Sequence, residues 1–205
     1  MRYVFLDIDG VLNFVGTKEG YQNFIGIDEN NLNHFAHFMQ SSNEIEETRI
    51  VLSSSWRMGV NNKGEEMPGI NKYLNERLAS VGLSIYDETP MYEGFGVRGK
   101  EIMSWLIKHT DIQDSYVIID DTLFPDFRSY GLLKNFVQTS CYASNGGFGW
   151  KHERKCLEIL KRQDDEVEEL NKLMEKCPLS IVSWSIKYRR YTDAALELIT
   201  ELKEL

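Results

Sequence analysis

The chain has 205 residues, of which 42% are hydrophobic and 12% aromatic, so it can bury the core of one domain with a small appendage and is not of the disordered class. Its 32 acidic and 23 basic residues give a formal charge of -9, which argues against general attraction to phosphate backbones or anionic membranes but leaves room for a local basic patch. The sequence shows no secretory signal, no apolar run of membrane-spanning length and no CxxC cysteine pair, so we expect a cytoplasmic protein with reduced thiols and without a zinc site.

Short apolar segments alternate with segments of helical spacing along most of the chain. The expected strands are residues 3–8, 50–52, 83–86, 116–119 and 135–138. The nearly continuous apolar character of the first and fourth is typical of strands in a parallel sheet whose two faces are both covered by helices. The sequence therefore predicts an α/β fold, in which ligands bind at the carboxyl ends of the strands.

Helices are expected between these strands and in the C-terminal tail. The first follows Asp28 as its N-cap, the second begins near Pro68 and ends at Gly82, and the third contains Trp105. The tail is charged and helical in period over residues 164–176, ambiguous between strand and helix over 179–188, and amphipathic over 192–205. We divide the chain into a domain of residues 1–163 and a mostly helical extension of residues 164–205 that packs on or beside it.

Two carboxylates, Asp7 and Asp9, end the first apolar strand just before Gly10, whose conformational freedom permits a tight turn. One carboxylate can attack a phosphoryl group to form an aspartyl-phosphate, while a second protonates the leaving oxygen and later activates water. We assign the first role to Asp7 and the second to Asp9. A turn-forming Asx pair or a simple calcium site is the alternative for this segment alone.

A second acidic group follows the strand at 116–119. It consists of Asp120 and Asp121, with Asp126 five residues further along the chain. Because magnesium prefers oxygen ligands, Asp7 and Asp121 can hold a magnesium ion if their strands are neighbours, with Asp120 and Asp126 just behind the ligands. Taken by itself, this segment could equally be a solvated acidic turn.

Phosphate-binding groups follow the strand at 50–52 and precede the helix with Trp105. Residues 53–57 offer hydroxyls and a guanidinium, and we expect Ser54, Ser55 and Arg57 to contact substrate, although a serine run can also cap a helix. Arg98 and Lys100 offer cations that can offset the charge on a transferring phosphoryl group, or they are ordinary surface charges.

Together, these segments resemble the four motifs of the haloacid dehalogenase (HAD) superfamily over residues 1 to about 160. More narrowly, the combination resembles the phosphatase domain found in Swiss Army Knife RNA repair proteins. The matching stretches are DIDGVLN at 7–13, SSSWR at 53–57, RGKEI at 98–102 with WL at 105–106, and IDD at 119–121. The resemblance implies a Rossmann-like sheet and a phosphatase with an aspartyl-phosphate intermediate.

The same resemblance implies roles for individual residues. A magnesium ion would be held by the Asp7 and Asp121 carboxylates and the Asp9 backbone carbonyl, and the Ser54 hydroxyl would bind phosphate. The cation of the third motif would be Arg98, with Lys100 kept as its rival.

The chain has little room for the cap domain that usually controls substrate size in this superfamily. Only residues 13–27 separate the first strand from its helix, so we expect no cap or a minimal one and an open site suited to a large substrate. A nucleic-acid 3′-phosphate is the first candidate substrate, and the alternative functions are a protein phosphatase and a non-catalytic scaffolding module.

The rim of the site is expected to be formed by the loops at 58–67 and 142–150, where Tyr142, Phe148 and Trp150 either stack on bases or pack internally. Nothing in the sequence indicates an oligomeric state.

Overall fold

The strand β1 (Arg2–Leu6) lies at the centre of a five-stranded parallel sheet of order β5-β4-β1-β6-β7. The computed structural model describes all residues except 62, 95, 112, 177–191 and 204–205. The other strands are β4 (Thr48–Leu52), β5 (Ile85–Glu88), β6 (Ser115–Asp120) and β7 (Phe136–Gln138). All five expected strands are present within two residues of their expected positions, and the α/β prediction with its parallel Rossmann-like sheet is confirmed.

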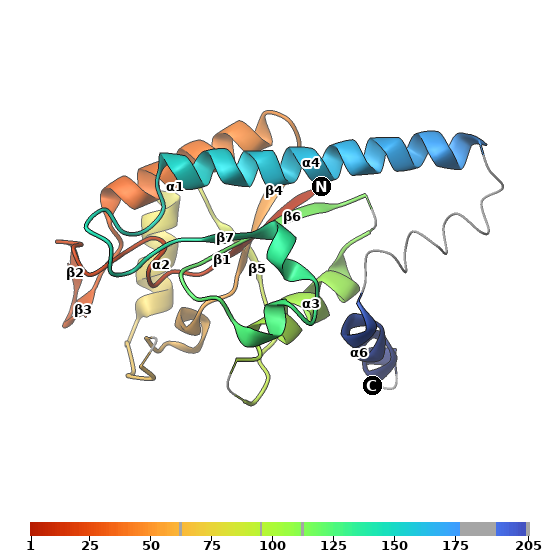
Figure 1. Ribbon diagram of the computed structural model, residues 1–205. Helices are drawn as coiled ribbons and strands as arrows, with labels where there is room; N and C mark the ends of the chain where they lie inside the picture. The colour runs from red at the N-terminus through yellow and green to blue at the C-terminus, as the bar shows by residue number, and fades with distance from the viewer. Residues whose placement is uncertain (62, 95, 112, 177–191, 204–205) are drawn as a thin grey trace.

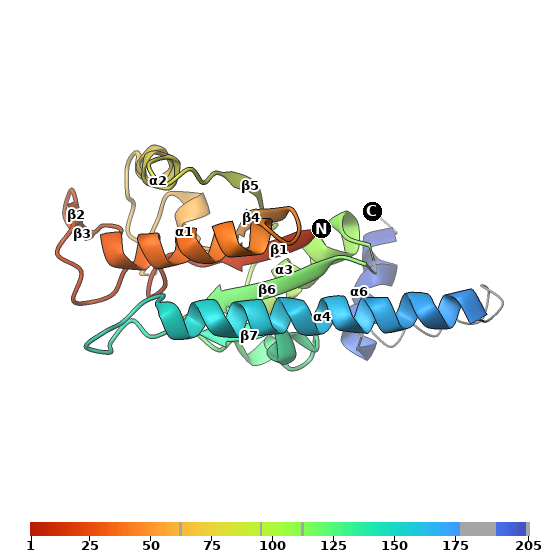
Figure 2. The same cartoon turned by 90° about the horizontal axis from the view of Figure 1, so that it is seen from above.

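Helices cover both faces of this sheet (Figures 1 and 2). On one face lie α1 (Glu29–Asn43), α2 (Ile70–Ala79) and α4 (Trp150–Lys176). On the other lie α3 (Arg98–His109) and α6 (Asp193–Lys203). Side chains alternate between the two cores along β1, so Val4 and Leu6 pack toward one layer while Tyr3 and Phe5 pack toward the other.

Local sequence signals set the helix starts. The Asp28 carboxylate accepts the backbone N–H groups of Asn30 and Asn31 at 3.0 and 3.1 Å, which makes it the expected N-cap of α1. α2 follows Pro68 by two residues, with Gly69 as its N-cap in the left-handed region at φ 76°. Short 3₁₀ helices lie in three connections, namely η1 (Ser55–Met58), η2 (Pro125–Phe127) and η3 (Leu132–Asn135).

The connection from β1 to α1 contains no cap domain. It holds a small antiparallel hairpin of β2 (Gly20–Tyr21) and β3 (Phe24–Ile25), which Figure 1 shows beyond the ends of the main strands. The Tyr21 and Tyr73 rings stack with centroids 4.4 Å apart, which fixes the hairpin against α2. The prediction of a minimal cap agrees with this arrangement.

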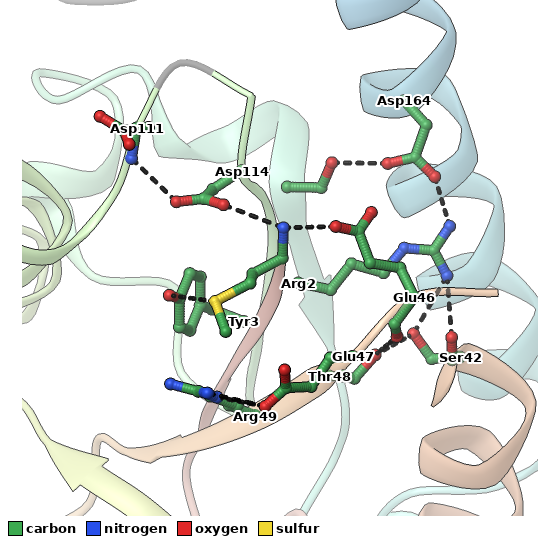
Figure 3. Close-up of polar contacts among 12 residues, drawn as sticks. Arg2, Tyr3, Ser42, Glu46, Glu47, Thr48, Arg49, Asp111, Asp114 and Asp164 are labelled. Carbon is green, nitrogen blue, oxygen red and sulfur yellow. Dashed lines mark hydrogen bonds and ion pairs between the residues drawn. The ribbon is translucent and has the colours of Figure 1, made fainter. Parts of the chain in front are cut away.

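A buried charge cluster at the opposite end of the sheet anchors α4 (Figure 3). The Arg2 side chain is 2% exposed, pairs with Asp164 and donates to the Ser42 carbonyl at 3.2 Å. Ser115 donates to the other Asp164 oxygen at 2.7 Å. Since a buried guanidinium is costly without partners, Asp164 fixes α4 to β1 and β6. The expected boundary between residues 163 and 164 lies within α4.

The described part of the C-terminal extension returns to the domain. Ala195 and Leu198 of α6 are buried in the core beneath α3, and Leu202 packs against it. The ambiguous segment at 179–188 lies outside the described residues. Among the helices that the structure describes, none combines the length and the apolar character needed to cross a membrane.

Candidate active site

Three carboxylates converge where β1 and β6 end. Asp7 directly follows β1, and its N–H donates to the Ile119 carbonyl of β6 at 3.0 Å. Asp120 is the last residue of β6, and Asp121 follows it. One carboxylate oxygen from each of the three aspartates lies within 4.8 Å of the others. The neighbouring register of β1 and β6, with Leu6 opposite Ile119, brings them together.

Mutual repulsion and burial shift the ionisation of this aspartate cluster. Burial raises the pKa of Asp7 to about 7, with Arg98 opposing the shift and Asp9 adding to it. Burial, followed by the charge of Asp7, raises the pKa of Asp120 well above its ordinary range, and burial also raises the pKa of Asp121. A divalent cation with a preference for oxygen would relieve this repulsion, so these residues fit a magnesium ion.

The Asp9 carboxylate is held from two directions. Trp56 Nε1 donates to Oδ2 at 3.1 Å, and Asn13 Nδ2 donates to Oδ1 at 3.0 Å. The Asn13 amide oxygen also accepts the Gly10 N–H at 2.9 Å, which closes the turn after β1. Because Trp56 and Asn13 are both buried, they fix the Asp9 side chain beside the cluster in one orientation.

Gly10 allows this turn to approach Asp121. Its φ is +77°, and a Cβ built on it would lie 2.4 Å from Asp121 Oδ2. Any side chain at this position would therefore displace the Asp121 carboxylate as well as strain the backbone. Thr139 supports the same turn by donating to the Gly10 carbonyl at 2.7 Å.

The serines after β4 lie against the aspartates. Ser53 N–H donates to the Leu6 carbonyl at 2.8 Å, which continues the β1 and β4 pairing to the site. Ser54 is fully buried, and its hydroxyl hydrogen-bonds Asp7 and lowers the pKa of that carboxyl. Its oxygen also accepts the Trp56 N–H at 3.4 Å as the cap of η1, in which Ser55 is the first residue. Ser54 therefore caps η1 and contacts Asp7 at the same time.

The two candidate cations of α3 separate in space. Arg98 NH1 donates to Ser53 Oγ at 3.2 Å, and its charge acts on Asp7 and Asp120. The Lys100 Nζ instead pairs with Glu201 of α6 at 3.1 Å, on the outer side of α3. The structure therefore brings Arg98, and not Lys100, to the aspartate cluster.

The comparisons with known proteins agree with this geometry. The family model described as HAD domain in Swiss Army Knife RNA repair proteins matches residues 3–144, well over half of the chain. The chain belongs to this family. Searches of curated proteins and of solved structures each return no significant match. The family match confirms the resemblance drawn from the four motifs, and all the residues of the aspartate cluster lie inside the matched range.

Asp126 of this HAD domain lies at the start of α3 and not in the aspartate cluster. It accepts the Lys100 backbone N–H at 2.9 Å, and a Cβ on Gly99 would lie 2.8 Å from its carboxylate. The N-cap residue Val97 has no capping side chain, so Asp126 supplies the missing acceptor from η2. Its contribution is to hold the helix that carries Arg98.

Arg57 forms an ion pair in which both side chains are buried. Its side chain is 4% exposed, and NH2 pairs with Glu101 at 2.7 Å while NH1 donates to the Ser54 carbonyl at 3.2 Å. Burial lowers the pKa of Arg57, and Glu101 opposes that shift. Glu101 also lies 3.8 Å from Arg98 Nε, so it joins the two guanidiniums. Arg57 therefore fixes η1 to α3, and contact with substrate would require it to leave this pair.

Several residues that complete the site had no role in the sequence interpretation. Asn13 and Trp56 hold Asp9, and Ser53 and Glu101 hold Arg98. All four lie inside or beside the motif stretches. The signal that could have found them is the presence of hydrogen-bonding side chains at buried positions next to catalytic candidates, because buried polar groups need partners.

The aromatic residues of the loop between β7 and α4 behave differently from one another. Phe148 is fully buried and packs edge-on against Phe35 with centroids 5.7 Å apart, so it belongs to the core and cannot stack on a base. Tyr142 and Trp150 are 83% and 59% exposed. The expected rim at 142–150 therefore offers two surface aromatic side chains.

Proposed function

We propose that this HAD domain is a magnesium-dependent phosphomonoesterase that forms an aspartyl-phosphate on Asp7. The convergence of Asp7, Asp120 and Asp121 with the Arg98 guanidinium at the ends of β1 and β6 carries the proposal. Membership of the HAD family supports it. Bound magnesium would be held by Asp7, Asp121 and the Asp9 carbonyl, with Asp120 adjacent, and would offset charge on the carboxylates and phosphoryl oxygens.

In the first half of the proposed reaction, an Asp7 oxygen attacks phosphorus as the bond to the leaving oxygen breaks. Asp9 gives a proton to that oxygen, and its two fixed hydrogen bonds to Trp56 and Asn13 hold it in position to do so. Arg98 and the Ser54 hydroxyl lie beside Asp7, where they can bind the phosphoryl oxygens.

In the second half, water attacks phosphorus and the bond to Asp7 breaks, releasing phosphate. Asp9 takes the proton from the water, which restores both carboxyl groups to their starting states. The proposal thus uses one covalent nucleophile and one proton carrier, each fixed by residues of the same domain.

A β1–α1 connection without a cap domain favours a macromolecular substrate, and we propose a nucleic-acid 3′-phosphate as the first class. Between β1 and α1 the described chain offers only the β2 and β3 hairpin as a cover, so a polymer end can enter. A cap is the usual means of excluding water from a small substrate.

Phosphate release should be measured with and without magnesium on 3′-phosphorylated oligonucleotides, phosphopeptides, nucleotides and sugar phosphates. We expect magnesium-dependent release with the highest kcat/KM on the oligonucleotides. A preference for phosphopeptides would favour the protein phosphatase instead. Absence of release from every compound would favour the non-catalytic scaffolding module.

A further inference from the structure

A cavity of about 570 Å³ lies between the β1–α1 connection and the loop before α4, at the carboxyl end of the sheet. Phe14, Lys18, His34, Asn145, Trp150 and Lys151 are among the residues that line it. In Figures 1 and 2, α1 and α4 both begin at this end of the sheet. Its volume falls within the range of small-molecule pockets, so it has room for a nucleoside.

This cavity adjoins the candidate catalytic residues through the chain itself. Phe14 lines it and directly follows Asn13, whose amide donates to the Asp9 carboxylate at 3.0 Å. Next to Phe14, Val15 N–H donates to the Cys141 carbonyl at 3.0 Å, and Thr139, two residues before Cys141, donates to the Gly10 carbonyl. The turn after Asp9 thus joins the candidate catalytic residues to the cavity wall at Phe14.

The walls of the cavity are fixed before any ligand binds. Phe148 is buried in the core, and its N–H donates to the Val11 carbonyl at 2.7 Å. Asn31 is buried and donates to the Gly146 and Phe148 carbonyls at 3.0 and 2.8 Å. These contacts hold the loop two residues before Trp150, so the exposed indole starts from an anchored position.

Cations lie around the exposed Trp150 ring despite the acidic composition of the chain. Lys151 Nζ and Arg154 Cζ lie 5.5 and 5.9 Å from the centroid of the Trp150 ring, and Lys18 lies on the opposite wall. Two acidic residues also line the cavity, namely Glu19 and Asp28, and the Asp28 carboxylate accepts two backbone N–H groups at the start of α1. An exposed aromatic ring flanked by cations matches a base and its phosphodiester.

We propose that this cavity binds a nucleotide next to the terminal phosphate of a single-stranded nucleic acid, with Trp150 stacking on its base and Lys151 contacting its backbone. The proposal rests on the proposed function, since it assumes that the terminal phosphate lies at Asp7. A phosphopeptide fits less well. Its phosphate would be used at Asp7 and would leave no second phosphate for Lys151, whereas a polynucleotide carries a phosphate at each nucleotide.

The test is binding of a fluorescently labelled single-stranded oligonucleotide with a 3′-hydroxyl, measured by anisotropy on the full chain. Because this probe has no terminal phosphate, its binding does not depend on the chemistry at Asp7. We expect Trp150→Ala to weaken binding about tenfold and Trp150→Phe to retain most of it. Lys151→Ala should weaken binding and reduce the slope of log affinity against log salt by about 0.7.

Matched control variants lie elsewhere on the surface. Tyr86→Ala removes a ring that is 51% exposed on β5, and Lys161→Ala removes an exposed lysine further along α4. Both should bind the oligonucleotide as the wild type does, and thermal melting should show all variants folded. Equal binding by Trp150→Ala and wild type, or no binding by wild type, would overturn the proposal. So would a phosphopeptide that binds with the same dependence on Trp150.

Hydrolysis of an aryl phosphate by the wild-type protein separates this proposal from the proposed function. If the wild-type protein hydrolyses the aryl phosphate but the Trp150 and Lys151 variants bind the oligonucleotide as tightly as the wild type, only the proposal of a nucleotide-binding cavity is overturned. If these variants bind the oligonucleotide more weakly and the wild type releases no phosphate, nucleotide binding in the cavity is supported and the proposed phosphatase activity is overturned.

Discussion

Arg98 and Lys100 lie on the same turn of α3, but their side chains contact different parts of the molecule. Arg98 NH1 donates to Ser53 Oγ at 3.2 Å beside the aspartates, whereas Lys100 Nζ pairs with Glu201 of α6 at 3.1 Å. The first contact places a positive charge beside the proposed nucleophile Asp7, and the second joins the C-terminal helix to α3.

Replacing these two cations separately should therefore give different results. We expect Arg98→Ala to lower kcat/KM about 100-fold or more, because charge on the phosphoryl group would lose its compensation. Lys100→Ala should lower kcat/KM by less than about threefold, since a surface ion pair contributes little. Steady-state kinetics on an aryl phosphate measure both values. A larger loss for Lys100→Ala would reverse the assignment.

Asp7→Asn should abolish turnover while the domain stays folded. The amide cannot attack phosphorus, so we expect a loss of several orders of magnitude in kcat. The melting temperature without metal should not fall, because the variant removes a buried carboxylate that repels its neighbours. Retention of more than about a tenth of the wild-type rate would refute Asp7 as the nucleophile.

The strands and the motif positions could be predicted from the sequence because both depend on local patterns. Apolar runs gave the five strands, and parallel strands bring their carboxyl ends to one edge, which places Asp7 beside Asp121. Asp120 was expected just behind the ligands. The strand ends at Asp120, however, and the chain turns, so both carboxylates reach the cluster.

Contacts between distant segments could not be predicted in this way. Lys100 meets Glu201 only because α6 packs on α3, and Asp126 caps α3 only because η2 lies at its first turn. Neither contact leaves a periodic signal in the sequence, since each depends on how two elements pack in the folded protein. The same holds for the cavity beside Phe14 and Trp150, whose walls come from distant parts of the chain.

Asp9→Asn should slow hydrolysis most for poor leaving groups. Proton donation to the leaving oxygen matters little for an aryl phosphate, whose leaving group is a stable anion, and matters more for an alkyl phosphate. We expect the ratio of aryl to alkyl kcat/KM to rise at least tenfold in this variant. Equal losses on both substrates would remove the acid role from Asp9.

Trp56→Phe tests whether the position of Asp9 matters for that role. The variant keeps most of the buried ring and removes the Nε1–H donor to Asp9 Oδ2. We expect a smaller change of the aryl to alkyl ratio in the same direction as for Asp9→Asn, with a melting temperature lowered by a few degrees. An unchanged ratio would show that Asn13 alone is sufficient to hold Asp9.

The stability of the metal-free domain should fall as the pH rises from about 4 to about 7. The folded-state pKa of Asp7 is raised to about 7 from the model-peptide value 3.8, so in this window the folded protein binds more protons than the unfolded chain. Stability then decreases with increasing pH, and the contribution of Asp7 is lost once the pH passes about 7. Asp120 adds to the fall because its pKa is raised as well.

Magnesium should reverse this dependence, because it binds the ionised carboxylates and competes with protons for them. We expect the increase in melting temperature on adding magnesium to be larger at pH 8 than at pH 5, as measured by differential scanning fluorimetry at both values. Asp7→Asn should reduce both the pH-dependent fall in stability and the increase in melting temperature with magnesium, because it removes one carboxylate from the cluster that would bind the ion. Sodium chloride at matched ionic strength is the control for general screening of charge. A magnesium effect that is equal at both pH values, or that sodium chloride reproduces, would mean that the aspartate cluster does not bind the ion through its ionised carboxylates.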